Sequence, residues 1–288
     1  MVQPSRTLAL IGPGRAGTTF ALALADHGWT VVAVAGRAPE AASTAAAAAT
    51  LATRASLVSE VGRGAEVVIV ATPDRAIDQA AAAAAPSLEP GALVVHLAGS
   101  RGLDAFDALA AVRPDLRFGA LHPLQSFPTT SVGLERLPGT WAAVAGDTQT
   151  RDIALLLGLR PFELTDRDRA RYHAAAVVAS NHVVALLGQV ERLASSCGVP
   201  FEAFRALVHA SVVNAFALGP GSALTGPVSR GDLATVERHL AALDPADRDA
   251  YRALAREAAR LTGRRDRAID RLLDDVLGAP PREDEAER

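Results

Sequence analysis

The first half of the chain alternates short apolar runs with longer segments of helical periodicity. The apolar runs predict strands at residues 8–11, 30–35, 66–71, 93–97 and 117–121, with a weakly marked strand near 53–55. Strands that are apolar at almost every position are typical of a parallel sheet covered by helices on both faces. We therefore predict an α/β fold built on a doubly wound parallel sheet.

The pattern changes after about residue 147. Apart from one short strand-like run at 160–164, helical periodicity dominates, with helices predicted at 168–197, 201–217, 231–242, 246–262 and 264–277. Residues 219–232 are too rich in glycine and proline for a helix, which predicts a loop. We predict a first domain over 1–147, an all-α domain over 148–279 and a disordered acidic tail over 280–288.

The first strand runs directly into a glycine turn, and the turn runs into a helix. The turn reads Gly12-Pro13-Gly14-Arg15-Ala16-Gly17. Strand, turn and helix in this order form the dinucleotide-binding fingerprint of the Rossmann fold. Gly12 permits the tight turn, Gly14 lets the backbone approach a pyrophosphate, and Gly17 lets the helix pack close to the strand. The free N–H groups of the helix then face the anion.

The residue about twenty positions beyond these glycines distinguishes the two nicotinamide cofactors. NAD-binding versions place a carboxylate there, which accepts from the ribose 2′-hydroxyl. This chain has Arg37 instead, and the first carboxylate after it is Glu40. A guanidinium pairs well with a 2′-phosphate, so the sequence favours NADP(H) over NAD(H). A solvated arginine at a strand end and a deazaflavin ligand stay open as alternatives.

Polar residues gather after the predicted strands, at the edge where open parallel sheets bind ligands. Thr72, Pro73 and Asp74 follow the fourth strand and are predicted to lie by the ribose and nicotinamide, while Ser100 follows the fifth. His122 follows the sixth and precedes a proline. Its imidazole can donate a proton to a developing alkoxide, but a structural role with bonds to loop carbonyls is an equal alternative. For His96, inside an apolar run, the structural role is favoured.

The long helix of the second half carries further candidates among alanines. On an ideal helix His173 and Ser180 lie about 20° apart, and Asn181 lies about 80° from His173. We expect His173 and Asn181 to serve the site, with buried hydrogen bonding as the alternative. Arg230 is a candidate for holding a substrate carboxylate. Its alternative is a pair with Asp232, which is equally a candidate helix N-cap.

Composition limits the partners and the catalytic residue types that are possible for this chain. The net charge is −3, and no basic excess or charge block indicates a nucleic acid or membrane-surface partner. The single cysteine, Cys197, excludes a disulfide framework and a cysteine zinc site, and we expect it to be buried; no metal is predicted. We also expect no leader and no membrane span, and hence a cytoplasmic protein. All 29 basic residues are arginine, so no lysine can act as acid, base or nucleophile.

Several motifs together resemble one group of proteins. They are the fingerprint, residues 71–74, the turn 96–100, the His122-Pro123-Leu124-Gln125-Ser126-Phe127 loop, residues 172–181 and residues 224–232. The group pairs a Rossmann-like domain with a helical C-terminal domain of unknown function. It is similar to the 6-phosphogluconate dehydrogenase-like superfamily, which includes pyrroline-5-carboxylate reductase, prephenate dehydrogenase and ketopantoate reductase. Some members resemble an alternative ketopantoate reductase of pantothenate synthesis.

The resemblance implies an NADPH-dependent reductase of a 2-oxo acid such as ketopantoate, but it has one gap. Related reductases place a catalytic lysine four residues before the asparagine, where this chain has Val177. His122, which corresponds loosely to the histidine of prephenate dehydrogenase, is the predicted replacement acid, with His173 as the other candidate. Asn181 and Ser100 are predicted to position the carbonyl. A homodimer through the C-terminal helices is expected. A prephenate dehydrogenase-like or deazaflavin-linked enzyme and a non-catalytic nucleotide sensor are the alternatives.

Overall fold

The computed structural model describes residues 6–263 and Leu273. The chain divides into two compact units, Met1–Val183 and Val184–Arg288. The last predicted helix, 264–277, and the predicted tail, 280–288, lie outside the described residues except for Leu273. Each unit is described by itself below.

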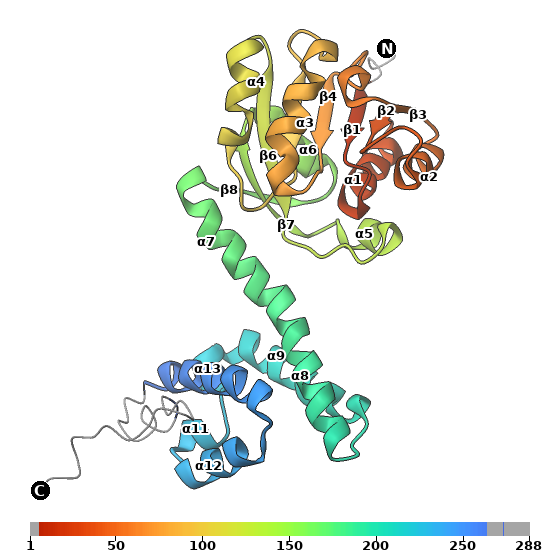
Figure 1. Ribbon diagram of the computed structural model, residues 1–288. Helices are drawn as coiled ribbons and strands as arrows, with labels where there is room; N and C mark the ends of the chain where they lie inside the picture. The colour runs from red at the N-terminus through yellow and green to blue at the C-terminus, as the bar shows by residue number, and fades with distance from the viewer. Residues whose placement is uncertain (1–5, 264–272, 274–288) are drawn as a thin grey trace, which may run out of the picture. The chain divides into compact units, whose positions relative to one another are not determined.

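The first unit is built on one eight-stranded sheet (Figure 1). Its spatial order is β3-β2-β1-β4-β5-β6-β7-β8, and every neighbouring pair is parallel except β6 with β7. The strands are β1 (Thr7–Ile11), β2 (Thr30–Ala35), β3 (Arg54–Ser56), β4 (Val67–Val70), β5 (Leu93–His96), β6 (Arg117–Pro123), β7 (Trp141–Gly146) and β8 (Arg160–Glu163). The strand order reverses between β1 and β4, which creates the switch point where such sheets bind ligands.

Helices cover both faces of the sheet, and the strand residues alternate between two cores. Leu8 and Leu10 pack with α1 (Arg15–Asp26), α2 (Ala42–Thr50) and α6 (Thr148–Leu156). Ala9 and Ile11 pack on the opposite face with α3 (Ile77–Ala84) and α4 (Asp107–Val112). A strand buried on both faces must be apolar throughout, which explains the continuous apolar runs. The predicted doubly wound α/β fold is confirmed.

The sheet extends further along the chain than the sequence predicts. The run predicted at 160–164 is β8, which pairs with β7. The alanine-rich β7 was not predicted, and it joins antiparallel to β6. The first compact unit therefore runs on to Val183, beyond the predicted boundary at residue 147. Between β6 and β7 lies α5 (Thr130–Arg136), which begins at a side-chain cap where Thr129 Oγ1 accepts from the N–H of Val132.

The long predicted helix is interrupted by a widened turn. It consists of α7 (Asp166–Val177), a π-helical turn over Val178–His182 and α8 (Val183–Ser196). Within the turn, Ser180 Oγ lies 2.8 Å from the Ala176 carbonyl oxygen and 2.8 Å from Asn181 Oδ1, and its single hydrogen is donated to one of these two acceptors. A π turn changes the angular position of all later residues, so the ideal-helix spacing between His173 and Asn181 does not hold.

The second unit is helical, as predicted. After α8 it contains α9 (Arg205–Leu218), α10 (Pro220–Ala223), α11 (Pro227–Arg230), α12 (Leu233–Ala242) and α13 (Pro245–Leu261). Its core includes Val236, Leu240, Ala255 and Ala259. Two corrections follow: the predicted loop 219–232 contains the four-residue helices α10 and α11, and Cys197 is exposed rather than buried.

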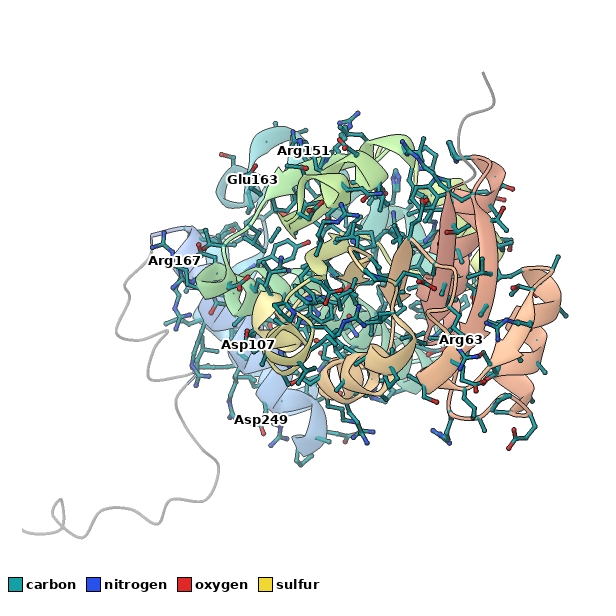
Figure 2. The ribbon with its side chains drawn as sticks, turned by 90° about the horizontal axis from the view of Figure 1, so that it is seen from above. Arg63, Asp107, Arg151, Glu163, Arg167 and Asp249 are labelled. Atoms are coloured by element: carbon teal, nitrogen blue, oxygen red, sulfur yellow. The ribbon has the colours of Figure 1, made fainter. Side chains whose placement is uncertain are left out.

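The exposed side chains of the first unit and those of α8 and α9 differ in polarity. Charged residues such as Arg63, Asp107 and Arg151 project from the surface of the first unit (Figure 2). By contrast, α8 and α9 expose large apolar residues, among them Val184, Leu207 and Phe216. The stretches Asp166–Ser196 and Phe201–Leu218 are long and apolar enough to cross a membrane, by length and composition alone. Length and composition do not distinguish a membrane span from a helix of a soluble protein, so the expectation of no membrane span stays a prediction.

Candidate functional site

The glycine turn lies at the switch point of the sheet, between the ends of β1 and β4. Gly12 has φ +98°, and a Cβ there would come within 2.6 Å of the Ala71 carbonyl and 2.7 Å of the Thr72 nitrogen. A Cβ on Gly17 would come within 2.5 Å of the Gly12 carbonyl oxygen. Both glycines are therefore required by close backbone approach, as the fingerprint predicts.

The start of α1 offers free hydrogen-bond donors. Gly14 is its N-cap and has no side-chain cap, and the first turn carries no acidic residue. A Cβ on Gly14 would meet nothing within 4 Å, so the glycine leaves open space there. Arg15 points elsewhere and donates through Nη1 to the carbonyl of Pro128 at 3.1 Å. An uncapped helix start beside open space fits a pyrophosphate.

Two further residues fit the same cofactor. Arg37, just beyond β2, is exposed, and no hydrogen bond or ion pair of it is found within the described residues. Thr72 Oγ1 is buried and has no partner in the described part of the chain. A buried hydroxyl without a partner costs free energy unless a ligand or water completes it. Pro73 is exposed beside it.

A second cluster forms where β5, β6 and α7 meet. His122 Nδ1 lies 2.8 Å from the Tyr172 hydroxyl, and the His122 and His173 ring centroids are 5.9 Å apart. Gly99 packs closely against both rings. A Cβ there would lie 2.6 Å from His173 Cδ2 and 2.8 Å from His122 Nε2. The loop after β5 thus holds two imidazoles and a phenol in contact.

The protonation state of His122 follows from its surroundings. Burial, with the charges of His173 and Arg169 as smaller causes, lowers the pKa of His122 to about 4. Burial also raises the pKa of Tyr172 to about 12. At neutral pH the phenol is therefore protonated and donates to Nδ1, which leaves the imidazole hydrogen on Nε2. His122 is neutral, and Nε2 makes no hydrogen bond within the described residues.

Asp74 and Ser100 link the two clusters. Ser100 Oγ donates to Asp74 Oδ2, which ties the loop after β5 to the loop after β4. The carboxylate is also close enough to His122 to act on its pKa, in the direction that raises it. Predicted residues from three successive strand ends therefore meet at one edge of the sheet.

His96 has the structural role that the sequence favoured. It is buried, its Nδ1 accepts from the N–H of Ala98 at 3.2 Å, and its Nε2 donates to the Gly102 carbonyl at 2.9 Å. Both ring nitrogens are occupied by backbone. Burial lowers the pKa of His96, which keeps it neutral.

The remaining predicted residues belong to other elements. Asn181 is exposed in the π-helical turn, and Arg230 is exposed in the second unit. Asp232 is an N-cap that accepts from the Thr235 N–H at 3.1 Å, and no ion pair joins it to Arg230 within the described residues. Tyr172 and Arg169 were not predicted as site residues from the sequence. The spacing of Arg169, Tyr172 and His173 at i, i+3 and i+4 is the signal that could have revealed them.

A hollow of about 530 Å³ lies at the amino ends of β4, β5 and β6, opposite the histidines. Glu66, Glu89, Gly91 and Arg117 are among its lining residues. Arg117 already has partners within the protein: its Nε donates to the Gly91 carbonyl at 2.9 Å, and its Nη1 forms an ion pair with Asp147 at 3.4 Å. Because parallel sheets bind ligands at their carboxyl ends, we place the site at the histidine edge.

Two family comparisons match different parts of the chain. Residues 7–99 match the family described as NADP oxidoreductase coenzyme F420-dependent. Residues 142–258 match a domain of unknown function, DUF2520. The second match begins close to the predicted domain boundary at residue 147, earlier than the compact second unit. No curated protein matches the chain.

Solved structures resemble the chain over most of its length. A protein from Bacteroides fragilis assigned as an NADP oxidoreductase is 25% identical, with a TM-score of 0.76 over 89% of this chain and 98% of its own. Protein TM1727 from Thermotoga maritima is 24% identical, with a TM-score of 0.61 over 92% and 95%. A pyrroline-5-carboxylate reductase from Coxiella burnetii is 16% identical, with a TM-score of 0.54 over 94% and 98%. The last two show the fold alone. The chain is therefore an NADP-dependent oxidoreductase of the Rossmann type, whose helical second part matches the DUF2520 domain.

Proposed function

We propose that the chain reduces a small carbonyl compound that bears a carboxylate, with NADPH as hydride donor and a 2-oxo acid such as ketopantoate as first choice. The observation that carries this proposal is the meeting of two features at one sheet edge. One is the glycine turn of Gly12 and Gly17, and the other is the neutral His122 with its Tyr172 donor.

The cofactor is proposed to lie across the glycine turn. Its pyrophosphate would contact the backbone over residues 12–17, including Pro13, Arg15 and Ala16, because the start of α1 is uncapped. Arg37 would pair with the 2′-phosphate. Thr72, Pro73 and Asp74 would lie by the ribose and nicotinamide, with the unpaired Thr72 hydroxyl as the nearest donor.

NADPH supplies the hydride when bound, and the chain supplies the proton. The Nε2–H of neutral His122 donates a hydrogen bond to the carbonyl oxygen and passes its proton as that oxygen becomes an alkoxide. Nδ1 takes the proton of the Tyr172 hydroxyl, 2.8 Å away, at the same time. The tyrosinate regains its proton from water. The relay avoids an imidazolium, which the low pKa of His122 disfavours.

Other predicted residues have supporting roles in this proposal. Ser100, oriented by Asp74, would position the carbonyl, and His173 beside His122 is the other candidate donor. Asn181 would contribute through the π-helical turn, a feature often found at functional sites. The sequence predicts that Arg230 holds the substrate carboxylate. Its side chain is exposed and so is accessible to a ligand.

Oxidation of NADPH in the presence of a panel of 2-oxo acids, ketopantoate among them, tests the proposal. We expect turnover that depends on one member of the panel, measured at 340 nm. If NADPH binds but no panel member is reduced, the proposal fails and the nucleotide-sensor alternative gains support.

The description of the matched family favours a second candidate, which is hydride exchange between NADP(H) and a deazaflavin. Adding oxidised coenzyme F420 to the NADPH assay separates the two. Its reduction at a rate well above that of every 2-oxo acid would replace the first proposal by the second.

Substituting Arg37 tests the cofactor assignment. We expect Arg37→Glu to raise the Kd for NADPH about 10- to 100-fold, because a phosphate partner becomes a repelling charge, and to leave the Kd for NADH within about twofold. Titration of nicotinamide fluorescence gives both constants. Arg63→Glu, at another exposed arginine, is the control. Tighter binding of NADH than NADPH by the unaltered chain would contradict the assignment.

The apolar surface of α8 and α9 is proposed to form a homodimer in the cytoplasm. Phe216 is 89% exposed and Val184 is 69% exposed, which is unusual for a surface that stays in water. Sedimentation without detergent tests this proposal. A dimer is the expected result, whereas a monomer, or a chain that requires detergent or lipid to stay dispersed, would contradict it.

A further inference from the structure

Arg169 is an unusually placed charge. It lies in the first turns of α7, and its side chain is only 1% exposed. Its Nε donates to Asp166 Oδ1 at 3.3 Å, and Asp166 Oδ2 accepts from the Leu103 N–H at 3.1 Å. The same carboxyl group occupies the space where a Cβ on Gly102 would lie. The beginning of α7 is thus fixed against the loop that follows β5.

The other side of the guanidinium has no hydrogen-bond partner among the described residues. Nη1 and Nη2 are both buried, and neither makes a hydrogen bond within the described residues. A buried charged group that lacks acceptors is costly, and the cost persists unless a ligand or water supplies them. The two Nη groups form a planar fork that matches a carboxylate or phosphate bidentately.

This fork belongs to the histidine site. Arg169, Tyr172 and His173 are spaced at i, i+3 and i+4, so they share one face of α7. Tyr172 bonds His122, and His173 contacts the same ring. The charge of Arg169 acts on both His122 and Tyr172, which requires it to lie near them.

We propose that Arg169 is the anion-binding residue of this site, and that its Nη1 and Nη2 take the carboxylate of the substrate beside the His122 imidazole. This assignment rests on the proposed function and replaces Arg230 in the carboxylate-binding role. It limits the substrates to anionic carbonyl compounds whose acid group lies next to the reacting carbon. Because both Nη groups are buried, such an anion must displace the atoms that cover them.

The test measures binding of oxalate, a dicarboxylate that cannot be reduced, by calorimetry on the full chain in the presence of NADP⁺. Inorganic phosphate is titrated separately to distinguish the two anion classes. Arg169→Met removes the charge and keeps an unbranched side chain, and Arg169→Lys retains a charge without the fork. Arg171→Met, at an exposed arginine of the same helix, is the control. Arg230→Met tests the competing assignment.

We expect Arg169→Met to weaken oxalate binding at least tenfold and Arg169→Lys to restore it only in part, while NADP⁺ binds unchanged. The melting temperature without oxalate should fall little, because Asp166, the partner that Arg169→Met leaves behind, is 48% exposed and keeps its bond from the Leu103 N–H. Equal oxalate affinity in Arg169→Met and the unaltered chain overturns the proposal, as does a loss found only in Arg230→Met. Preference for phosphate over oxalate overturns the carboxylate assignment.

Failure of this inference is distinguishable from failure of the proposed function. Oxalate binding requires no turnover, so it can depend on Arg169 even where no 2-oxo acid is reduced. Conversely, if a 2-oxo acid is reduced and its KM is unchanged in Arg169→Met, the function stands and the role of Arg169 is refuted.

Discussion

Replacing His122 with asparagine is expected to lower kcat for carbonyl reduction about 100-fold or more, the usual contribution of a positioned proton donor. The substitution removes the Nε2–H that is proposed to donate to the substrate carbonyl and the Nδ1 that accepts from Tyr172 at 2.8 Å. Binding of NADPH should be unchanged, since His122 lies outside the glycine turn. Stopped-flow measurement of a single turnover separates this loss from any change in product release.

The control for this experiment is His27→Asn, which alters an exposed histidine at the end of α1. Tyr172→Phe should reproduce part of the loss, because it removes only the donor to Nδ1. An unchanged rate in His122→Asn would eliminate His122 as the proton donor, and a loss in His173→Asn alone would transfer the role to His173.

The pH dependence of the rate examines the protonation state directly. The pKa of His122 is about 4, so a mechanism that uses the neutral ring is insensitive to its titration between pH 5 and 8. A mechanism that required the imidazolium would slow about tenfold for each pH unit above that pKa. The reductive kcat/KM should therefore show no such decline with rising pH, and a tenfold decline per unit would contradict the neutral-ring relay.

Replacing Gly14 with alanine is expected to weaken NADPH binding at least tenfold without unfolding the protein. Its added methyl group meets nothing within 4 Å, so the folded chain tolerates it. The methyl group would instead occupy the space through which a pyrophosphate approaches the backbone. Fluorescence titration measures the binding, and thermal unfolding without cofactor measures the stability.

Gly12→Ala provides the contrasting case. Its Cβ would collide with the Ala71 carbonyl at 2.6 Å, and its backbone has φ +98°, so we expect a lower melting temperature even without NADPH. Gly28→Ala, at a positive φ with open space around it, controls for backbone strain alone. If Gly14→Ala binds NADPH as the unaltered chain does, the turn is not the pyrophosphate site.

The features that the sequence predicts well are those set by local pattern. A glycine at a fixed spacing behind an apolar strand specifies its own turn, so residues 12–17 were placed correctly. Strands buried on both faces are apolar at every position and are visible as runs. The strand β7 escaped prediction because its alanines have low strand propensity and its pairing with β6 depends on distant residues.

The parts of the site that escaped prediction depend on contacts between distant residues. His122 and Tyr172 are separated by 50 positions, and nothing local pairs them. The low pKa of His122 arises from burial, which only the folded chain determines. The π-helical turn over Val178–His182 likewise shifts Asn181 from its ideal-helix position, and no sequence signal marked it. In the sequence nothing distinguishes Arg169 from the arginines near it, and only its burial in the folded chain does so.

The close packing of Gly99 against the two imidazoles limits which residues relatives of this chain can carry at that position. Any side chain at that position would intrude on His173 Cδ2 and His122 Nε2 at once, at 2.6 and 2.8 Å. A side chain at this position therefore requires the two rings to shift from the places they have here. A homologue that carries alanine or a larger residue there must have lost or turned one ring. The residue at this single position therefore indicates whether a relative can keep both imidazoles where they lie here.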